Sequence, residues 1–435
     1  MTRRYVIIGG GPAAIAAAGV IYEEDAAGQV LIIGDDPNGF YSRPGLAYYI
    51  NGEIRDRELL LRHAANFQFV KAKVTAVDAL AHQVTLENSS KYNYHRLLLA
   101  TGSLSTQMSI PGAGLEGVVK LDDMEDAKKI IKLVGRSKTA VVTGGGITAL
   151  EIVEALASHG VETHFIMRGE RYWYNVLDVA ESAIVERLLK NKGVRLYHRS
   201  QLSRILDKHG KVAAVETEDG KKISCQMVAM AIGVQPRIEL ARSAGLKTDR
   251  GIITDEWLQT SAPDIFAAGD VAQVFDPHSG KTTLEMLWGK ALAQGKAAGK
   301  NMGGRRIPYV KDVPFNVTRL AGLTTTIIGA VGNSNGGEEV LSVSRGESET
   351  WRHLPNTITV QCDFDFNRTR ILVGVNTIAG AVVMGDQTLS RPLHQLIARR
   401  VDISHIRPRL LAPGASLVDT IIEFWSDWNR FHEAS

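Results

Sequence analysis

The 435 residues carry 50 Lys and Arg against 47 Asp and Glu, a net charge of +3 that is too weak to indicate nucleic-acid binding. The two cysteines, Cys225 and Cys362, exclude a disulfide scaffold and are too few for an iron–sulfur cluster, which normally takes about four thiolates. We expect a cytoplasmic protein, because a strand at 4–8 leaves no room for a signal peptide and no apolar run approaches the ~18 residues of a transmembrane helix.

Two stretches of the chain repeat one order of elements. Residues 6–24 read as a short apolar strand, a glycine turn and a helix, and a second strand follows at 29–33. Residues 141–159 repeat that order, with the next strand at 161–167. Short alternating strands follow each unit, at 68–78, 82–87 and 91–100 in the first copy and at 203–207, 211–217 and 221–231 in the second. We therefore predict an α/β protein with two Rossmann-like dinucleotide-binding domains.

The last third of the chain has a different pattern. A helix is expected at 287–301, and from Pro308 onward the alternation of apolar residues indicates strands. Residues 358, 360, 362, 364 and 366 share one face of such a strand. The pattern predicts a third, α+β domain. Its final segment, 417–431, has apolar residues at helical spacing, which favours core packing over docking to a partner or to a membrane surface.

The two glycine turns carry the chemistry. A phosphate must approach backbone amides closely, and glycine leaves that approach open while the following helix N-terminus contributes favourable partial charge. Both turns fit the GxGxxG/A pattern, the first with Gly9, Gly11 and Ala14 and the second with Gly144, Gly146 and Ala149. Because each turn lies between a strand and a helix, we interpret both as binding sites for the diphosphate of a dinucleotide.

Charged residues after the second strand of each unit bear on which dinucleotide binds. Asp35 and Asp36 lie at the distance expected for an acid that binds a ribose hydroxyl, and either residue fits. In the second unit, Arg168 and Arg171 are suited to a 2′-phosphate, which favours NADPH over NADH. Solvated turns and surface arginines are the plain alternative for these side chains.

From these motifs the chain resembles the FAD-dependent pyridine nucleotide oxidoreductases, flavoproteins with two dinucleotide-binding domains. Ala100-Thr101-Gly102 resembles the ATG junction of that family, and 260–270 resembles its second FAD motif. The resemblance implies an FAD domain split between 1–118 and 244–305, an NAD(P) domain at 119–243, and a C-terminal interface domain at 306–435. Beyond the first glycine turn, it implies FAD-binding roles for Asp35, Asp36, Arg43, Pro44, Val74, Thr101, Gly102, Gly269, Asp270 and Leu287. Beyond the second turn, it implies NAD(P)-binding roles for Glu151, Arg168, Arg171 and Gly233.

The family divides by the acceptor that takes electrons from the flavin. Its disulfide reductases carry a cysteine pair after the first βα unit, whereas this chain has no cysteine in its first 224 residues. Cys225 and Cys362 are expected to be core residues. Arg43-Pro44 instead resembles the reductases that serve rubredoxin or ferredoxin, and 379–386 resembles the third domain of rubredoxin-reductase and nitrite-reductase-like flavoproteins. Tyr48 stands where many relatives have a lysine, which leaves the role of Glu151 near the nicotinamide open.

The resemblance implies a reductase that passes a hydride from NAD(P)H to FAD and then electrons to a protein redox partner. Apart from Glu151, no side chain is expected to be catalytic, because the cofactors carry the chemistry. No HExxH or CxxC pattern predicts a metal site. An oxidase or quinone reductase with small acceptors is one alternative, and a redox-sensing or structural flavoprotein subunit is another. A homo-oligomer or a larger complex is compatible with each of these.

Overall fold

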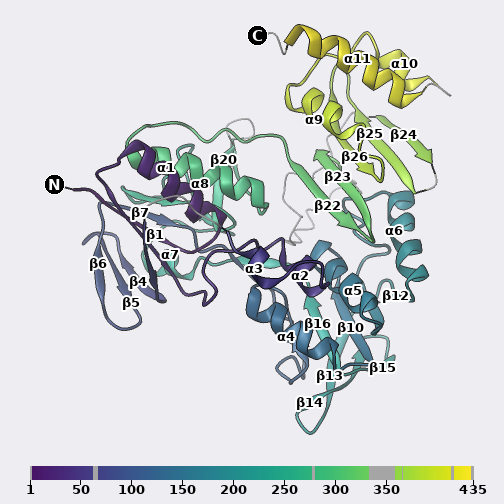
Figure 1. Ribbon diagram of the computed structural model, residues 1–435, viewed down its shortest axis with the longest axis horizontal. Coiled ribbons are helices and arrows are strands. Elements are labelled where there is room, and N and C mark those ends of the chain that lie inside the picture. The colour runs from purple at the N-terminus through teal and green to yellow at the C-terminus, as the bar shows by residue number, and fades with distance from the viewer. Residues whose placement is uncertain are drawn as a thin grey trace.

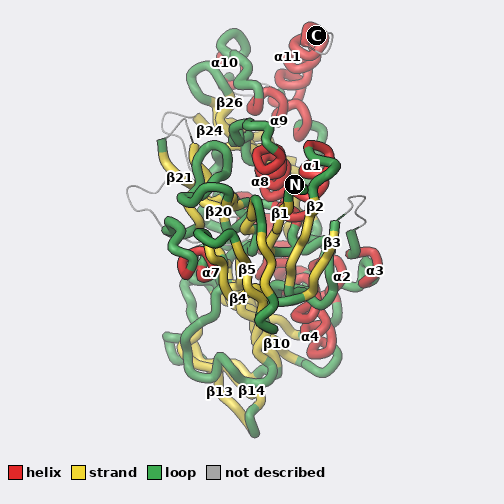
Figure 2. Tube along the Cα trace, turned by 90° about the vertical axis from the view of Figure 1, so that its left-hand side faces the viewer, coloured by secondary structure: helices red, strands yellow, loops and turns green. Residues whose placement is uncertain are grey.

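The computed structural model describes residues 2–61, 67–276, 280–332, 358–364, 366–412 and 416–432, with the backbone alone described for 358–364. The described chain forms three parts, and in Figure 1 the first lies on the left, the second at the lower right and the third at the upper right. Seen from the side in Figure 2, the hairpin of β13 (Leu202–Lys208) and β14 (Lys211–Thr217) lies at one end, and the helices α10 (Arg407–Leu411) and α11 (Leu417–His432) lie at the other. Two parts are built on parallel sheets and the third on an antiparallel sheet, as the predicted fold class requires.

The first part contains a parallel sheet in the order β19-β7-β1-β2-β3. Its strands are β1 (Arg4–Ile8), β2 (Gln29–Gly34), β3 (Gln68–Lys71), β7 (Arg96–Leu99) and β19 (Ile265–Ala267). A small antiparallel sheet of β4 (Val74–Asp78), β5 (Gln83–Leu86) and β6 (Lys91–Asn93) lies beside it. Because β19 follows the whole second part in sequence, the chain returns to its first sheet after leaving it.

Helices α1 (Pro12–Glu24) and α8 (Trp288–Gly303) lie side by side in this part (Figure 1). Their backbones approach so closely that a Cβ at Gly295 would lie 2.2 Å from the carbonyl oxygen of Ala13. Gly299 faces Ala17 in the same way, one turn further along. The two helices therefore run in the same direction, and their N-termini lie at the same edge of the molecule.

The second part repeats this architecture. Its parallel sheet has the order β12-β11-β10-β16-β9, formed by β9 (Val118–Val119), β10 (Thr139–Gly144), β11 (Glu162–Ile166), β12 (Arg195–Tyr197) and β16 (Met227–Ala231). Its helices are α4 (Met124–Val134), α5 (Ile147–Ser158) and α6 (Val179–Asn191), and its small sheet contains β13 (Leu202–Lys208), β14 (Lys211–Thr217) and β15 (Lys222–Ser224). The two connections to the first part, β8 (Ser103–Ser105) and β17 (Val234–Pro236), pair with each other.

The predicted strands 68–78, 91–100 and 221–231 are wrong as single strands, because each divides into two. In every case one half belongs to a parallel sheet and the other half to a small antiparallel sheet. The breaks fall at 72–73, 94–95 and 225–226, which contain neither glycine nor proline. Local sequence therefore gave no turn signal where the chain passes from one sheet to the next.

The third part is an antiparallel sheet in the order β22-β23-β26-β25-β24, with three helices. The strands are β22 (Phe315–Leu320), β23 (Leu323–Gly329), β24 (Ile358–Phe364), β25 (Asn367–Val373) and β26 (Ile378–Met384). The helices are α9 (Ser390–Ala398), α10 (Arg407–Leu411) and α11 (Leu417–His432). Leu417 and Ile421 of α11 are buried in the core of this part, and Trp425 donates a hydrogen bond to Gln395 at 2.6 Å, so α11 packs on the third part.

Short elements complete the described chain. They are α2 (Leu46–Ile50), α3 (Asp56–Leu59), α7 (Glu239–Ser243), β18 (Ile252–Ile253), β20 (Ala272–Asp276) and β21 (Lys281–Leu284). Within the described ranges, no helix combines the length and the apolar character that crossing a membrane requires.

Candidate functional site

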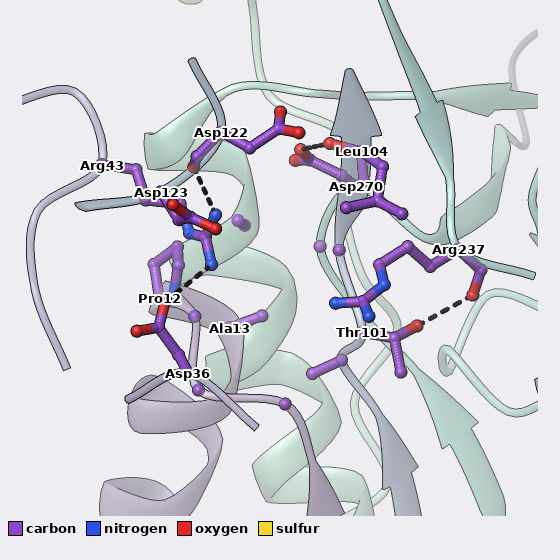
Figure 3. A pocket seen from close by; sticks show the side chains of 18 of the residues that line it. Pro12, Ala13, Asp36, Arg43, Thr101, Leu104, Asp122, Asp123, Arg237 and Asp270 are labelled. Carbon is purple, nitrogen blue, oxygen red and sulfur yellow. Dashed lines mark hydrogen bonds and ion pairs between the residues drawn. The ribbon is translucent and has the colours of Figure 1, made fainter. Parts of the chain in front are cut away.

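A cavity of about 990 Å³ lies where the three parts meet. The first glycine turn and residues 100–104 line it from the first part, and α5 lines it from the second. Residues 316–319 of β22 form the wall contributed by the third part. Pockets of several hundred Å³ are typical of cofactor sites, and this one is at the upper end of that range. Figure 3 shows its inner wall, with Pro12 and Ala13 at the start of α1.

In the first glycine turn, Gly9 and Gly11 meet different demands. Gly9 has a φ of +121°, and a Cβ there would lie 2.2 Å from the carbonyl oxygen of Ala100. A Cβ on Gly11 would meet no atom within 4 Å and would instead protrude into the cavity. Gly11 therefore leaves room for a ligand at the N-terminus of α1, as a bound phosphate requires. Ala14 is buried within α1 and does not line the cavity.

The second glycine turn has the same geometry. Gly144 has a φ of +149°, and a Cβ there would lie 2.1 Å from the carbonyl oxygen of Ala231 and 3.0 Å from the Cβ of Ala149. Gly146 immediately precedes α5 and, with Gly233, lines a small hollow. That hollow shares Thr148 with the main cavity. The second turn thus adjoins the cavity without forming its main wall.

The two arginines of the second unit lie outside the cavity lining. Arg168 is exposed just beyond the end of β11. Arg171 is half-buried, where it contacts the Glu170 carboxylate and donates a hydrogen bond to the carbonyl oxygen of Tyr174 at 3.0 Å. Arg168 is therefore the more accessible of the two predicted 2′-phosphate ligands.

Both candidate ribose acids line the cavity, but their surroundings differ. Asp36 accepts a hydrogen bond from the Tyr41 hydroxyl at 2.7 Å, and a guanidinium nitrogen of Arg43 lies 3.6 Å from its carboxylate. Burial, together with this neighbouring carboxylate, raises the pKa of Tyr41, so its hydroxyl stays protonated and donates. Asp35 is more exposed and lies 3.6 Å from the guanidinium of Arg237. Both acids remain candidates for a ribose hydroxyl.

Arg43 lies at the side of the cavity, together with Pro44 and Val74. Its guanidinium donates a hydrogen bond to the carbonyl oxygen of Asp122 at 2.6 Å (Figure 3). Since Asp122 lies just before α4, this bond joins the first part to the start of the second part. Arg43 thus both lines the cavity and holds the connection between the two parts.

The motif at 260–270 ends inside the cavity. Asp270 accepts a hydrogen bond from the Ser103 hydroxyl at 2.7 Å. Gly269 has a φ of +82° and donates its amide to Gln294 of α8 at 2.8 Å, which fixes the start of α8 relative to Asp270. Leu287 directly precedes α8 and lines the cavity, as do Thr101 and Gly102.

The part of the cavity lining that α5 and β22 contribute contains residues that the sequence did not reveal. Glu151, which was predicted, is joined there by Glu154 of the same helix and by Arg319 of β22. Arg319 contacts Glu53, and its guanidinium carbon lies 5.2 Å from the centre of the Tyr48 ring. No local motif marks Glu154 or Arg319, because only the tertiary fold brings β22 to α5.

Among the described lining residues of the cavity there is no cysteine. Cys225 is fully buried in the core beneath β13–β15, where burial raises the pKa of its thiol to about 12. It is the core residue that the sequence predicted, although it lies between β15 and β16 rather than in a strand. The side chain of Cys362 lies outside the described residues. In the described part, no three His, Cys, Asp or Glu side chains gather as a metal ion would require.

Comparison with known proteins decides the family. The sequence profile described as "Pyridine nucleotide-disulphide oxidoreductase" matches residues 3–295. The chain belongs to this family. A probable ferredoxin reductase of Castellaniella defragrans is 31% identical over 321 residues, which cover 72% of this chain and 78% of the relative. An NADH oxidase of Methanocaldococcus jannaschii is 29% identical over 395 residues, which cover 87% and 88%.

Solved structures agree with this family in fold. The crystal structure of a ferredoxin reductase from Rhodopseudomonas palustris matches with a TM-score of 0.85 at 20% sequence identity. The match covers 97% of this chain and 100% of that chain, so the third part is included. The protein is therefore an oxidoreductase of the FAD- and NAD(P)H-dependent type, with two Rossmann-like parts and an antiparallel C-terminal part.

The cavity fits the cofactors that the family implies. FAD is an extended dinucleotide, and it requires a backbone approach for its diphosphate and a long continuous space for its two ends. Gly11 provides the approach, because a side chain there would occupy the cavity rather than the protein interior. The same cavity extends to Leu287 at the start of α8 and to Glu151 of α5.

Proposed function

We propose that this protein is an NAD(P)H-dependent flavoprotein reductase that delivers electrons to a small protein redox partner of the ferredoxin or rubredoxin type. One observation carries the proposal. A single cavity connects the first glycine turn, the start of α8 and the α5 helix of the second glycine turn, and its described lining contains no thiol. Such a site can bring two dinucleotides together without a disulfide relay.

In this proposal, the chain's residues divide by cofactor. The amides after Gly9 and Gly11 would bind the FAD diphosphate, Asp35 or Asp36 a ribose hydroxyl, and Asp270 the ribityl side. Gly144, Gly146 and Gly233 would hold the nicotinamide nucleotide, with Glu151 beside the nicotinamide. Bound FAD would accept a hydride from NAD(P)H and release electrons one at a time.

The start of α8 has an electrostatic role in the proposal. Met286, Leu287 and Trp288 line the cavity where this 16-residue helix begins. The positive end of the helix dipole would therefore face the flavin and stabilise negative charge that develops on its reduction. The close packing of α1 against α8 keeps this end beside the diphosphate site.

The preference for NADPH rests on Arg168. Its exposed side chain follows β11, where a ribose of the nicotinamide nucleotide is expected, whereas Arg171 already contacts Glu170. The name of the M. jannaschii relative specifies NADH, which is the competing possibility. Arg168→Ala should therefore raise the KM for NADPH more than the KM for NADH.

Anaerobic stopped-flow absorbance tests the proposal. The purified flavoprotein is mixed with NADH or NADPH in separate experiments, and the reduced protein is then mixed with an oxidised ferredoxin or rubredoxin. We expect rapid bleaching of the flavin with at least one nucleotide, followed by rapid reduction of the iron protein. A protein without flavin, or one whose flavin no nicotinamide nucleotide reduces, would contradict the proposal.

A second candidate is an NAD(P)H oxidase that uses oxygen directly, favoured by the likeness to an NADH oxidase over most of both chains. Oxygen consumption measured with an electrode distinguishes the two functions. Turnover with oxygen alone that matches turnover with the iron protein would select the oxidase.

A further inference from the structure

Arg237 enters the cavity from the connection that leads back from the second part to the first. It directly follows β17, and its backbone is held at both ends. Its amide donates a hydrogen bond to the carbonyl oxygen of Gly102 at 2.9 Å, and its carbonyl oxygen accepts one from the Thr101 hydroxyl at 3.0 Å. The side chain therefore starts from a fixed point beside the Thr101-Gly102 junction.

The guanidinium of Arg237 points into the cavity. Figure 3 shows it on the opposite side of the cavity from Arg43, between Thr101 and Asp270. Its side chain is 35% exposed, and a guanidinium nitrogen lies 3.6 Å from the Asp35 carboxylate. At that separation the two groups form an ion pair without a short hydrogen bond. The N–H groups of the Arg237 guanidinium are thus accessible to a ligand in the cavity.

The charge of the cavity shows why such a donor matters. Acidic residues outnumber basic ones in its described lining, eight against four, and a dinucleotide diphosphate adds further negative charge. Two of the four cations make close contacts with the protein, because Arg43 donates a short hydrogen bond to the carbonyl oxygen of Asp122 and Arg319 contacts Glu53, whereas Arg237 makes the longer ion pair with Asp35. The acids are Asp35, Asp36, Asp122, Asp123, Glu151, Glu154, Glu239 and Asp270, and the bases are Arg43, Lys73, Arg237 and Arg319.

We infer that Arg237 is an additional phosphate ligand for the dinucleotide at the first glycine turn. Its guanidinium donates charge-assisted hydrogen bonds to the diphosphate, which the α1 N-terminus holds from the other side. The inference rests on the proposed binding of FAD and extends it. Because Arg237 belongs to the connection between the two parts, retention of the cofactor is coupled to the position of that connection.

Titration of apoprotein with FAD, followed by flavin fluorescence, tests the inference. Arg237→Gln removes the charge and keeps most of the side-chain length, so we expect the Kd for FAD to rise about tenfold or more, the effect of losing one hydrogen bond to a charged group. Arg237→Lys should recover part of the affinity. Arg242→Gln is the matched control, because it removes the same charge from an exposed position of α7 outside the cavity.

Two further measurements separate phosphate binding from a structural role. The difference in Kd between wild type and Arg237→Gln should shrink as ionic strength rises, because salt screens a charge contact. In the Asp35→Asn background, Arg237→Gln should still weaken FAD binding. No additional loss there would mean that Arg237 acts only through Asp35 and would overturn the inference.

The outcomes distinguish this inference from the proposed function. If wild-type apoprotein takes up no FAD, the proposed function itself fails. If wild type binds FAD and Arg237→Gln binds it with unchanged Kd, the proposed function stands and the inference is wrong. Circular dichroism of the apoproteins confirms that the variants fold.

Discussion

At the first glycine turn, two glycines two residues apart are required for unrelated reasons. Gly9 is required by the protein, because its φ of +121° and the nearby carbonyl oxygen of Ala100 leave no place for a Cβ. Gly11 would be required by the proposed dinucleotide, because a Cβ there meets no protein atom within 4 Å and Gly11 lines the cavity. Glycine therefore occurs at two positions of this motif for two reasons. At Gly9 it allows a backbone conformation that other residues rarely adopt, and at Gly11 it leaves the site open to a ligand.

This difference predicts opposite behaviour for two valine variants. Gly11→Val should fold with nearly unchanged stability and lose most of its flavin, whereas Gly9→Val should be destabilised, with backbone strain alone costing about 1–3 kcal/mol. Thermal unfolding and the flavin-to-protein absorbance ratio measure the two effects. Gly145→Val is the control, because a Cβ there also meets no atom within 4 Å but lies in the second turn. A Gly11→Val protein that keeps its full flavin content would refute the assignment of this turn.

Sequence alone led to candidate residues that lie in short local motifs. The first glycine turn, Thr101 and Asp270 are contained in short motifs and line one cavity, and the second glycine turn adjoins that cavity. Arg237, Glu154 and Arg319 were missed, since their positions follow from contacts between distant segments. The Arg319–Glu53 pair joins residues 266 positions apart. No periodicity or turn signal encodes such a contact.

At the scale of elements, helices were easier to predict than strands. The predicted starts of α8 and α11 agree with the structure to within one residue, because a long amphipathic pattern averages over several turns. The strands that pass from one sheet to another were merged, because their alternation continues through the break. What the helix pattern did not show is that α8 packs against α1 through glycines.

Replacement of these helix glycines tests that packing. Gly295→Ala should destabilise the protein by about 1–3 kcal/mol, the usual cost of overpacking, because the new methyl group would overlap the backbone of Ala13. It should also weaken FAD binding by displacing the start of α1. Gly289→Ala is the matched control in the same helix, since a Cβ there meets nothing within 4 Å. Helix propensity favours that change by up to about 1 kcal/mol. The free energy of unfolding of both variants is measured in urea. If Gly295→Ala were as stable as Gly289→Ala, α1 and α8 would not be closely packed at Gly295.

At the scale of the whole molecule, the cavity depends on how the third part is attached. Its wall at 316–319 belongs to β22, yet ionic contacts anchor the same sheet to α6, away from that wall. Arg370 of β25 donates two hydrogen bonds to the buried Glu181, at 2.8 and 3.0 Å. Arg368 donates one to Asp178 at 2.8 Å. These contacts fix the position of the third part relative to the second. They therefore help to position the cavity wall formed by β22, although they lie outside the cavity.

The contact of Asp178 makes this attachment depend on pH. Burial alone would raise the pKa of Asp178, but the backbone amide of Glu181 and the guanidinium of Arg368 together lower it below the ordinary value. A lowered pKa in the folded state stabilises the protein above the unfolded pKa of about 3.9, and this contribution is lost as pH falls through the folded pKa.

Asp178→Asn isolates that contribution, because asparagine still caps the N-terminus of α6 but carries no charge. We expect the variant to be less stable than wild type at neutral pH, and the difference in free energy of unfolding to vanish in acid once Asp178 of wild type is protonated. Urea unfolding at several pH values measures this. Glu216→Gln, which removes the charge of the partly exposed pair with Arg204, is the control and should change stability by less than about 1 kcal/mol. A difference that is constant with pH would show that the charge of Asp178 does not hold the third part in place.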